Sequence, residues 1–215
     1  MTTIAAHERM LLCALAQQLG PDEPTLCGDW TVRDLVAHLI VREGSPAAVG
    51  ITVSPLAGVT ESAMRREAAK DFHAMVTKLR HGPPLWSPLR LPKIGPMLNT
   101  MEFFVHHEDI RRAQPAWEPR LLPPHVEEVV WRGATLAGKG FTRSAPVAVT
   151  LQRSDTGEQA RLSGGEGEVV VRGLPAELAM FVYGRQGHAR VDLAGESDAV
   201  AALRGTDLGI SRTVI

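Results

Sequence analysis

The chain lacks the features that point to a nucleic-acid-binding, membrane or exported protein. Lys and Arg number 23 against 24 Asp and Glu, so no excess of positive charge is present to pair with phosphates or anionic lipid. No apolar run approaches the roughly 20 residues that a membrane-spanning helix needs, and the N-terminus lacks the basic and apolar segments of a signal peptide. We therefore expect a cytoplasmic protein that binds neither nucleic acid nor membranes.

Cysteine, lysine and asparagine are also scarce. Two cysteines, Cys13 and Cys27, are too few for a disulfide framework in 215 residues and lack CxxC spacing, so we expect both to be reduced core residues. Only four of the 23 basic residues are Lys, and Asn99 is the one asparagine. This bias against AT-rich codons is typical of a GC-rich bacterial genome such as an actinobacterial one.

Helical periodicity dominates the first half of the chain. Thr31 and Asp34 form a capping-box pattern, which predicts a helix that starts at Val32. The other predicted helices cover residues 4–19, 59–80, 97–113 and 124–138, with a proline-rich loop over 82–96. Helices of this length favour a bundle of four or five.

The pattern changes to short strands after residue 140. Alternating apolar residues from Val147 to Leu151, a turn at 155–157 and a return strand near Leu162 predict a hairpin. A strand at 169–171, a helix at 175–183, a strand at 191–193 and a helix at 197–203 follow. The expected class is α+β, with a helical bundle over 1–140 and a small α/β domain over 146–215.

One stretch of the fourth helix carries the residues most suited to metal binding. Glu102, His106 and Asp109 share a helical face, because steps of four and three residues each advance about one turn. A carboxylate and an imidazole on one face can chelate a metal ion, but zinc needs further ligands. His38, on the second helix, is the best third ligand, and Asp109 would accept a hydrogen bond that orients His106.

Two alternatives stay open on the residues alone. His38 can be a core histidine bonded to a carboxylate or to backbone, and Glu102 with His106 can be a solvated surface pair. Apolar residues around the pair favour a buried helix. His107 lies about 100° from His106 on the helical wheel and does not share the Glu102 face. The Arg111-Arg112 pair is expected to form the solvated end of this helix.

Residues 26–39, LCGDWTVRDLVAHL, and 102–110, EFFVHHEDI, together resemble the DinB-like superfamily. The similar branch is that of mycothiol-dependent maleylpyruvate isomerase and its actinobacterial relatives. The resemblance implies His38, Glu102 and His106 as metal ligands, a DinB-like four- or five-helix bundle, and a following small α/β domain similar to sterol carrier proteins. His107 stands where the isomerase pattern often has a small residue, which places the chain in a sister subgroup.

The resemblance also implies a chemistry. The ion would be zinc, or another divalent metal such as nickel or iron, and a low-molecular-weight thiol such as mycothiol would act with it on a small electrophilic substrate, in isomerisation or thiol transfer. Arg185 is the candidate for an arginine that the isomerase supplies from its C-terminal domain. The alternatives are a non-catalytic protein that uses metal for stability or senses a small ligand, and a facial iron site for oxygen chemistry. The sequence leaves the oligomeric state open.

Overall fold

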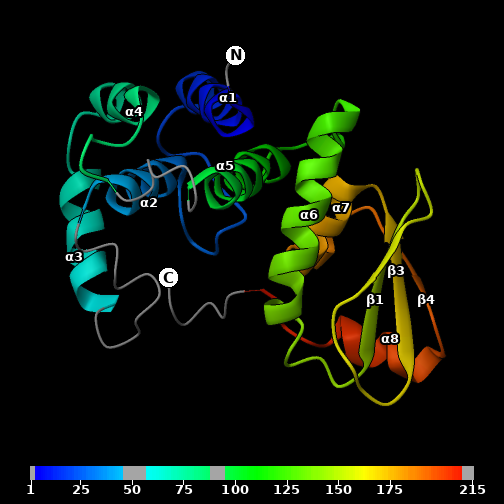
Figure 1. Cartoon of the computed structure of the whole chain (residues 1–215). Helices are drawn as coiled ribbons and strands as arrows, with labels where there is room; N and C mark the ends of the chain where they lie inside the picture. Colours follow the sequence, from blue (N-terminus) through cyan, green and yellow to red (C-terminus); the bar gives the residue numbers. More distant parts are fainter. Residues whose placement is uncertain (1–2, 46–56, 88–94, 210–215) are drawn as a thin grey trace. The chain divides into compact units, whose positions relative to one another are not determined.

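The structure is a computed structural model that describes residues 3–45, 57–87 and 95–209, the first two residues of the last range by their backbone only. The described residues divide into two compact units, one up to Trp117 and one that starts at Glu118 (Figure 1). Within the described ranges no helix is both long and apolar enough to cross a membrane. The predicted α+β class is confirmed, with helices first and a small mixed sheet after them.

In its described residues, the first unit has five helices (Figure 1): α1 Ile4–Leu19, α2 Val32–Gly44, α3 Ala57–Ala68, α4 Phe72–His81 and α5 Gly95–Arg112. The single helix predicted over 59–80 is wrong. It is two helices, because the Asp71 side chain accepts a hydrogen bond from Ala74 N at 2.8 Å and so caps a new helix. Of the loop predicted over 82–96, residues 88–94 lie outside the described residues and α5 already includes Gly95 and Pro96.

The start of α2 follows from its capping box, as predicted. The Asp34 backbone N–H donates to Thr31 Oγ1, and the Asp34 carboxylate accepts from Thr31 N at 3.0 Å. This cap fixes the rotation of the helix, so that Leu35, Val36 and Leu39 are fully buried in the core between α1, α2, α4 and α5. His38 lies on the same helix and is 5% exposed.

The second unit contains α6 Pro124–Phe141, the sheet and two further helices, α7 Pro175–Val182 and α8 Ser197–Arg204, with a short 3-10 helix, η4, at Gln186–His188. The sequence predicts α6 as part of the helical bundle, but it lies in the second unit. Its Glu127 carboxylate accepts a hydrogen bond from Ala176 N at the start of α7, at 3.1 Å. The division between the units therefore precedes α6.

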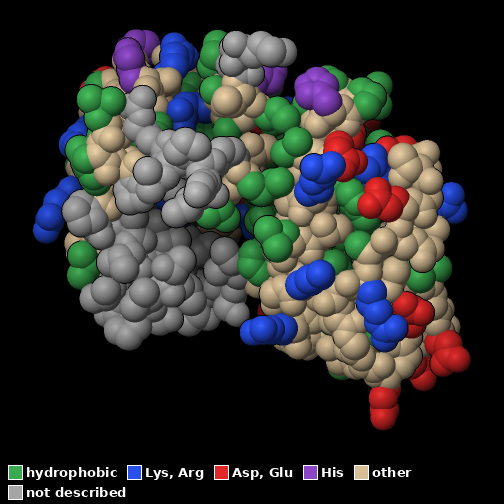
Figure 2. Space-filling view, in the orientation of Figure 1, with side chains coloured by type: hydrophobic (Ala, Val, Ile, Leu, Met, Phe, Trp, Pro, Cys, Tyr) green, Lys and Arg blue, Asp and Glu red, His purple; other side chains and the backbone are tan. Residues whose placement is uncertain are grey.

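The sheet has the strand order β2-β1-β3-β4. Its strands are β1 Ala148–Arg153, β2 Gln159–Arg161, β3 Glu168–Gly173 and β4 Asp192–Ala194. The predicted hairpin is present as the antiparallel pair β1–β2, whereas β1 and β3 are parallel. On the face of this unit that Figure 2 shows, Lys and Arg side chains lie among Asp and Glu.

Candidate metal centre

Three predicted ligands converge between α2 and α5. Glu102 Oε1 lies 3.2 Å from His38 Nε2 and 3.3 Å from His106 Nε2. The two imidazole rings meet edge to face with their centroids 5.3 Å apart. These three ligand atoms lie within 4.8 Å of one another, which is close enough for one ion to contact all of them. The surface-pair alternative is wrong for His106, which is buried, whereas His38 is a core histidine bonded to a carboxylate, as the other alternative describes.

The electrostatics of two of the three side chains, His38 and Glu102, suit a cation. Burial lowers the pKa of His38, so its imidazole is neutral at pH 7, as a metal ligand must be. Burial alone would raise the pKa of Glu102, but the Arg42 guanidinium and the hydrogen bonds to His106 and His38 outweigh it and hold that pKa well below its usual value. Glu102 is therefore an ionised carboxylate, and its side chain is 24% exposed.

Arg42 belongs to the site although the motif analysis did not select it. Its Nε lies 3.2 Å from Glu102 Oε1, the same oxygen that both histidines approach, and its Nη1 donates to Asn99 Oδ1 at 3.0 Å. Arg42 is four residues after His38 on α2, so helical spacing alone places both side chains on the face toward α5. That spacing is the signal by which the sequence could have identified it.

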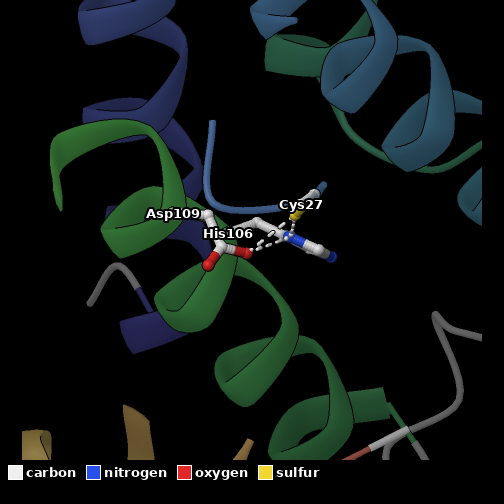
Figure 3. A group of neighbouring side chains, drawn as sticks. All are labelled: Cys27, His106 and Asp109. Carbon is white, nitrogen blue, oxygen red and sulfur yellow. Dashed lines mark hydrogen bonds and ion pairs between the residues drawn. The ribbon is translucent and has the colours of Figure 1, made fainter. Parts of the chain in front are cut away.

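His106 uses its two ring nitrogens in opposite directions. Nε2 faces Glu102, and Nδ1 lies 2.9 Å from Asp109 Oδ2, whose side chain is fully buried (Figure 3). Burial would lower the pKa of His106, but hydrogen bonds to Asp109, Cys27 and Glu102 outweigh it and raise that pKa well above the usual value. Asp109 thus makes the orienting contact that the spacing predicted.

Cys27 was expected in the core and instead lies at the core's edge, beside this centre. Its Sγ donates to Asp109 Oδ2 at 3.1 Å and lies 3.7 Å from His106 Nδ1 (Figure 3). Cys27, His106 and Asp109 form a second group whose ligand atoms lie close together. No sequence spacing signals this contact, because the loop between α1 and α2 brings Cys27 to α5. Cys13, by contrast, is fully buried as expected, and burial raises its pKa to about 11.

The remaining candidates lie elsewhere. His107 Nδ1 is 2.9 Å from Glu8 Oε2 on α1, so it faces away from Glu102 as the helical wheel predicts. The expected solvated end of α5 is wrong for Arg112, which is buried with its Nε donating to Glu108 Oε2 at 2.6 Å. Arg185 is in the second unit, where it directly precedes η4 and its Nη1 donates to the Tyr183 carbonyl at 2.6 Å.

A groove of about 550 Å³ in the first unit borders the centre through Trp30. The Trp30 ring lines the groove and also contacts the His38 ring, with centroids 5.1 Å apart. Asp34, Glu61 and Arg65 add charged groups of both signs to its walls. The groove has room for a small polar organic molecule beside Trp30.

Comparisons with known proteins agree with the fold. Residues 4–81 match the family model described as "Mycothiol maleylpyruvate isomerase N-terminal domain". A crystal structure of the mycothiol-dependent maleylpyruvate isomerase has 14% sequence identity and a TM-score of 0.62, over 90% of this chain and 91% of that one. A form of that isomerase with one histidine replaced by alanine gives 13% identity and a TM-score of 0.63, with the same coverage. No curated protein sequence matches significantly. At these identities the two structures establish the fold.

Proposed function

We propose that the chain, whose residues 4–81 match the N-terminal domain model of mycothiol maleylpyruvate isomerase, is a DinB-like, metal- and thiol-dependent isomerase or transferase that acts on a small electrophile. One observation carries the proposal: two imidazole nitrogens and one carboxylate oxygen from α2 and α5 meet as a single group. The alternative is a metal-binding protein without catalytic activity, in which the same three ligands stabilise the helices or sense a small ligand.

His38, Glu102 and His106 would hold the ion. Two nitrogens and one oxygen are donors that zinc accepts, and a catalytic zinc site has three protein ligands with one position left for another group. Nickel and iron bind similar donors. When bound, the ion would keep the sulfur of a low-molecular-weight thiol such as mycothiol as a thiolate at neutral pH, which supplies a nucleophile.

The surrounding residues have separate tasks. Asp109 orients His106 through the hydrogen bond at Nδ1 and so leaves Nε2 directed at Glu102. Trp30 covers His38 and forms the near wall of the groove, where the organic part of a thiol or substrate would lie. Arg185 remains our candidate for the arginine that the second unit contributes to the reaction.

Metal content is the first test. We expect the full chain, purified without added metal, to contain close to one equivalent of a transition metal, and His106→Ala to contain less than about a tenth. His107→Ala is the matched control, because His107 is the next residue, is also buried and bonds Glu8 instead. Retained metal in His106→Ala, or none in the wild type, contradicts the proposed ligands.

Thiol binding and turnover separate the two functions. We expect calorimetric titration to detect mycothiol binding to the metal-loaded protein and not to the metal-free protein. Maleylpyruvate, the substrate in the name of the structural relative, is the first electrophile to assay. Arg185→Gln should lower turnover while metal content stays unchanged. Metal without any thiol binding would favour the non-catalytic alternative.

A further inference from the structure

We propose that Cys27 is a positioning residue that holds the Asp109 carboxylate and, through it, the His106 imidazole in the orientation needed for metal binding. This inference rests on the proposed function, because it concerns how one of the proposed ligands is held. Cys27 was not among the residues that the motifs single out. Its role follows from where the loop before α2 places its sulfur (Figure 3).

Two donors converge on one carboxylate oxygen. Asp109 Oδ2 accepts from Cys27 Sγ at 3.1 Å and lies 2.9 Å from His106 Nδ1. Asp109 is fully buried, so an oxygen that lost one of these donors would not be compensated by bulk water. The carboxylate therefore has less freedom to rotate with the thiol present than without it.

The direction of the thiol hydrogen bond matters for the tautomer of His106. Cys27 Sγ is closer to Asp109 Oδ2, at 3.1 Å, than to His106 Nδ1, at 3.7 Å. A thiol that donates to Asp109 leaves Nδ1 free to donate its own hydrogen to the same oxygen. A neutral imidazole with its hydrogen on Nδ1 presents a lone pair at Nε2, which is the nitrogen that faces Glu102.

The loop is anchored to the same residue that its thiol contacts. Leu26 N donates to the Asp109 carbonyl at 3.1 Å, so both the backbone and the side chain of Asp109 bond to this loop. Thr25 Oγ1 accepts from Cys27 N at 3.1 Å and donates to the Trp30 carbonyl at 2.9 Å. These bonds fix the position of the sulfur before any ion is bound.

The geometry favours this role over direct ligation of the proposed ion. The sulfur lies on the Nδ1 side of His106, whereas Glu102 lies on the Nε2 side, opposite on the same ring. A metal ligand on the far side of the ring would need a separate ion with Asp109 and Nδ1 as its other ligands. We treat that arrangement as one outcome that overturns the proposal.

The test compares zinc affinity in four variants of the full chain by competition with a chromophoric chelator. Cys27→Ala and the similarly sized Cys27→Val lose the donor, and we expect zinc binding to weaken about 10- to 100-fold. Cys27→Ser keeps a donor, and its affinity should stay within about threefold of the wild type on the same scale. Cys13→Ala removes the other thiol, from the core, and should lower the thermal midpoint without changing zinc affinity.

A cobalt-substituted sample gives the spectroscopic readout. We expect the wild-type cobalt spectrum to lack a thiolate-to-cobalt charge-transfer band, and Cys27→Ala to shift its visible bands without adding one. A charge-transfer band that Cys27→Ala abolishes would make Cys27 a ligand and overturn the proposal. The positioning role of Cys27 is wrong if zinc affinity is unchanged in both Cys27→Ala and Cys27→Val. It is also wrong if Cys27→Ser loses as much zinc affinity as Cys27→Ala, and in both cases the metal site itself stands. A wild type that binds no metal removes the proposed function as well.

Discussion

The Arg42 guanidinium would compete with a bound metal ion for the Glu102 carboxylate. Its guanidinium lies against the one Glu102 oxygen that both histidines approach, at 3.2 Å, so it neutralises that carboxylate when no ion is bound. An ion on the same oxygen would have to share it with the guanidinium. Replacing Arg42 by Met should therefore affect the metal-free and metal-bound proteins in opposite directions.

The magnitude follows from Coulomb's law. Two unit charges 4 Å apart interact by about 4 kcal/mol at an effective dielectric constant of 20, and a dication doubles this value. Arg42 can relieve much of the repulsion by turning toward Asn99, to which it already donates. We expect a net gain of about 1.5–3 kcal/mol in zinc binding for Arg42→Met, or roughly 10- to 100-fold in affinity. The metal-free protein should lose about 1 kcal/mol, because the pair is partly exposed.

Two measurements check this prediction: zinc affinity by chelator competition, and the free energy of unfolding in urea with EDTA. Arg33→Met is the control, since Arg33 is on the same helix but donates to the carbonyls of Ala68 and Lys70, away from Glu102. It should reduce stability and leave zinc affinity unchanged. Zinc affinity in Arg42→Met that equals or falls below the wild-type value would refute the reasoning and show that Arg42 supports the ligand set.

Three further predictions concern stability and thiol reactivity. Thr31→Ala removes the capping box of α2 and should lower the free energy of unfolding by about 1 kcal/mol, whereas Thr31→Ser should not; equal losses would exclude the cap as the cause. In the folded protein at pH 8, iodoacetamide should label the partly exposed Cys27 but not Cys13, whose pKa of about 11 leaves about one thiol in a thousand ionised; mass spectrometry of the native and urea-unfolded protein checks this. Burial raises the pKa of Glu127, so the folded state keeps the Glu127 proton to a higher pH than the unfolded state does. The stability that the protonated Glu127 contributes is therefore full below about pH 4.5 and is lost as pH rises through the folded pKa. Glu127→Gln should therefore gain stability relative to the wild type between pH 4 and pH 7 in urea titrations, and a constant difference across that range would contradict the assignment.

The sequence was most informative where a local rule determines the structure. The capping box fixed the start of α2, and helical spacing put Glu102, His106 and Asp109 on one face, because both depend only on neighbouring residues. His38 was predicted as the third ligand before the resemblance supported it, but no local pattern says that its helix faces α5. The family match over residues 4–81 covers that helix.

Local sequence patterns gave wrong predictions where tertiary packing determines a helix boundary, a unit or the burial of a side chain. Apolar periodicity continues across residues 59–80, so the cap at Asp71 was missed and one helix was predicted in place of two. α6 has the amphipathic pattern of a bundle helix, but periodicity does not say which unit covers its apolar face. Arg112 looked like a solvated helix end, yet it is buried with its guanidinium against Glu108 and over the Trp117 ring. Cys27 reaches Asp109 across 82 residues of chain.

The proposed ligands come from segments far apart in the chain, with His38 and Glu102 separated by 64 positions. An ion bound by both would act as a reversible cross-link between α2 and α5. By the loop-closure relation used for disulfides, joining two points that far apart reduces the entropy of the unfolded chain by an amount worth about 4 kcal/mol. The ion would then stabilise the fold as well as supply chemistry, and a chelator strong enough to remove it would loosen the packing of α2 against α5.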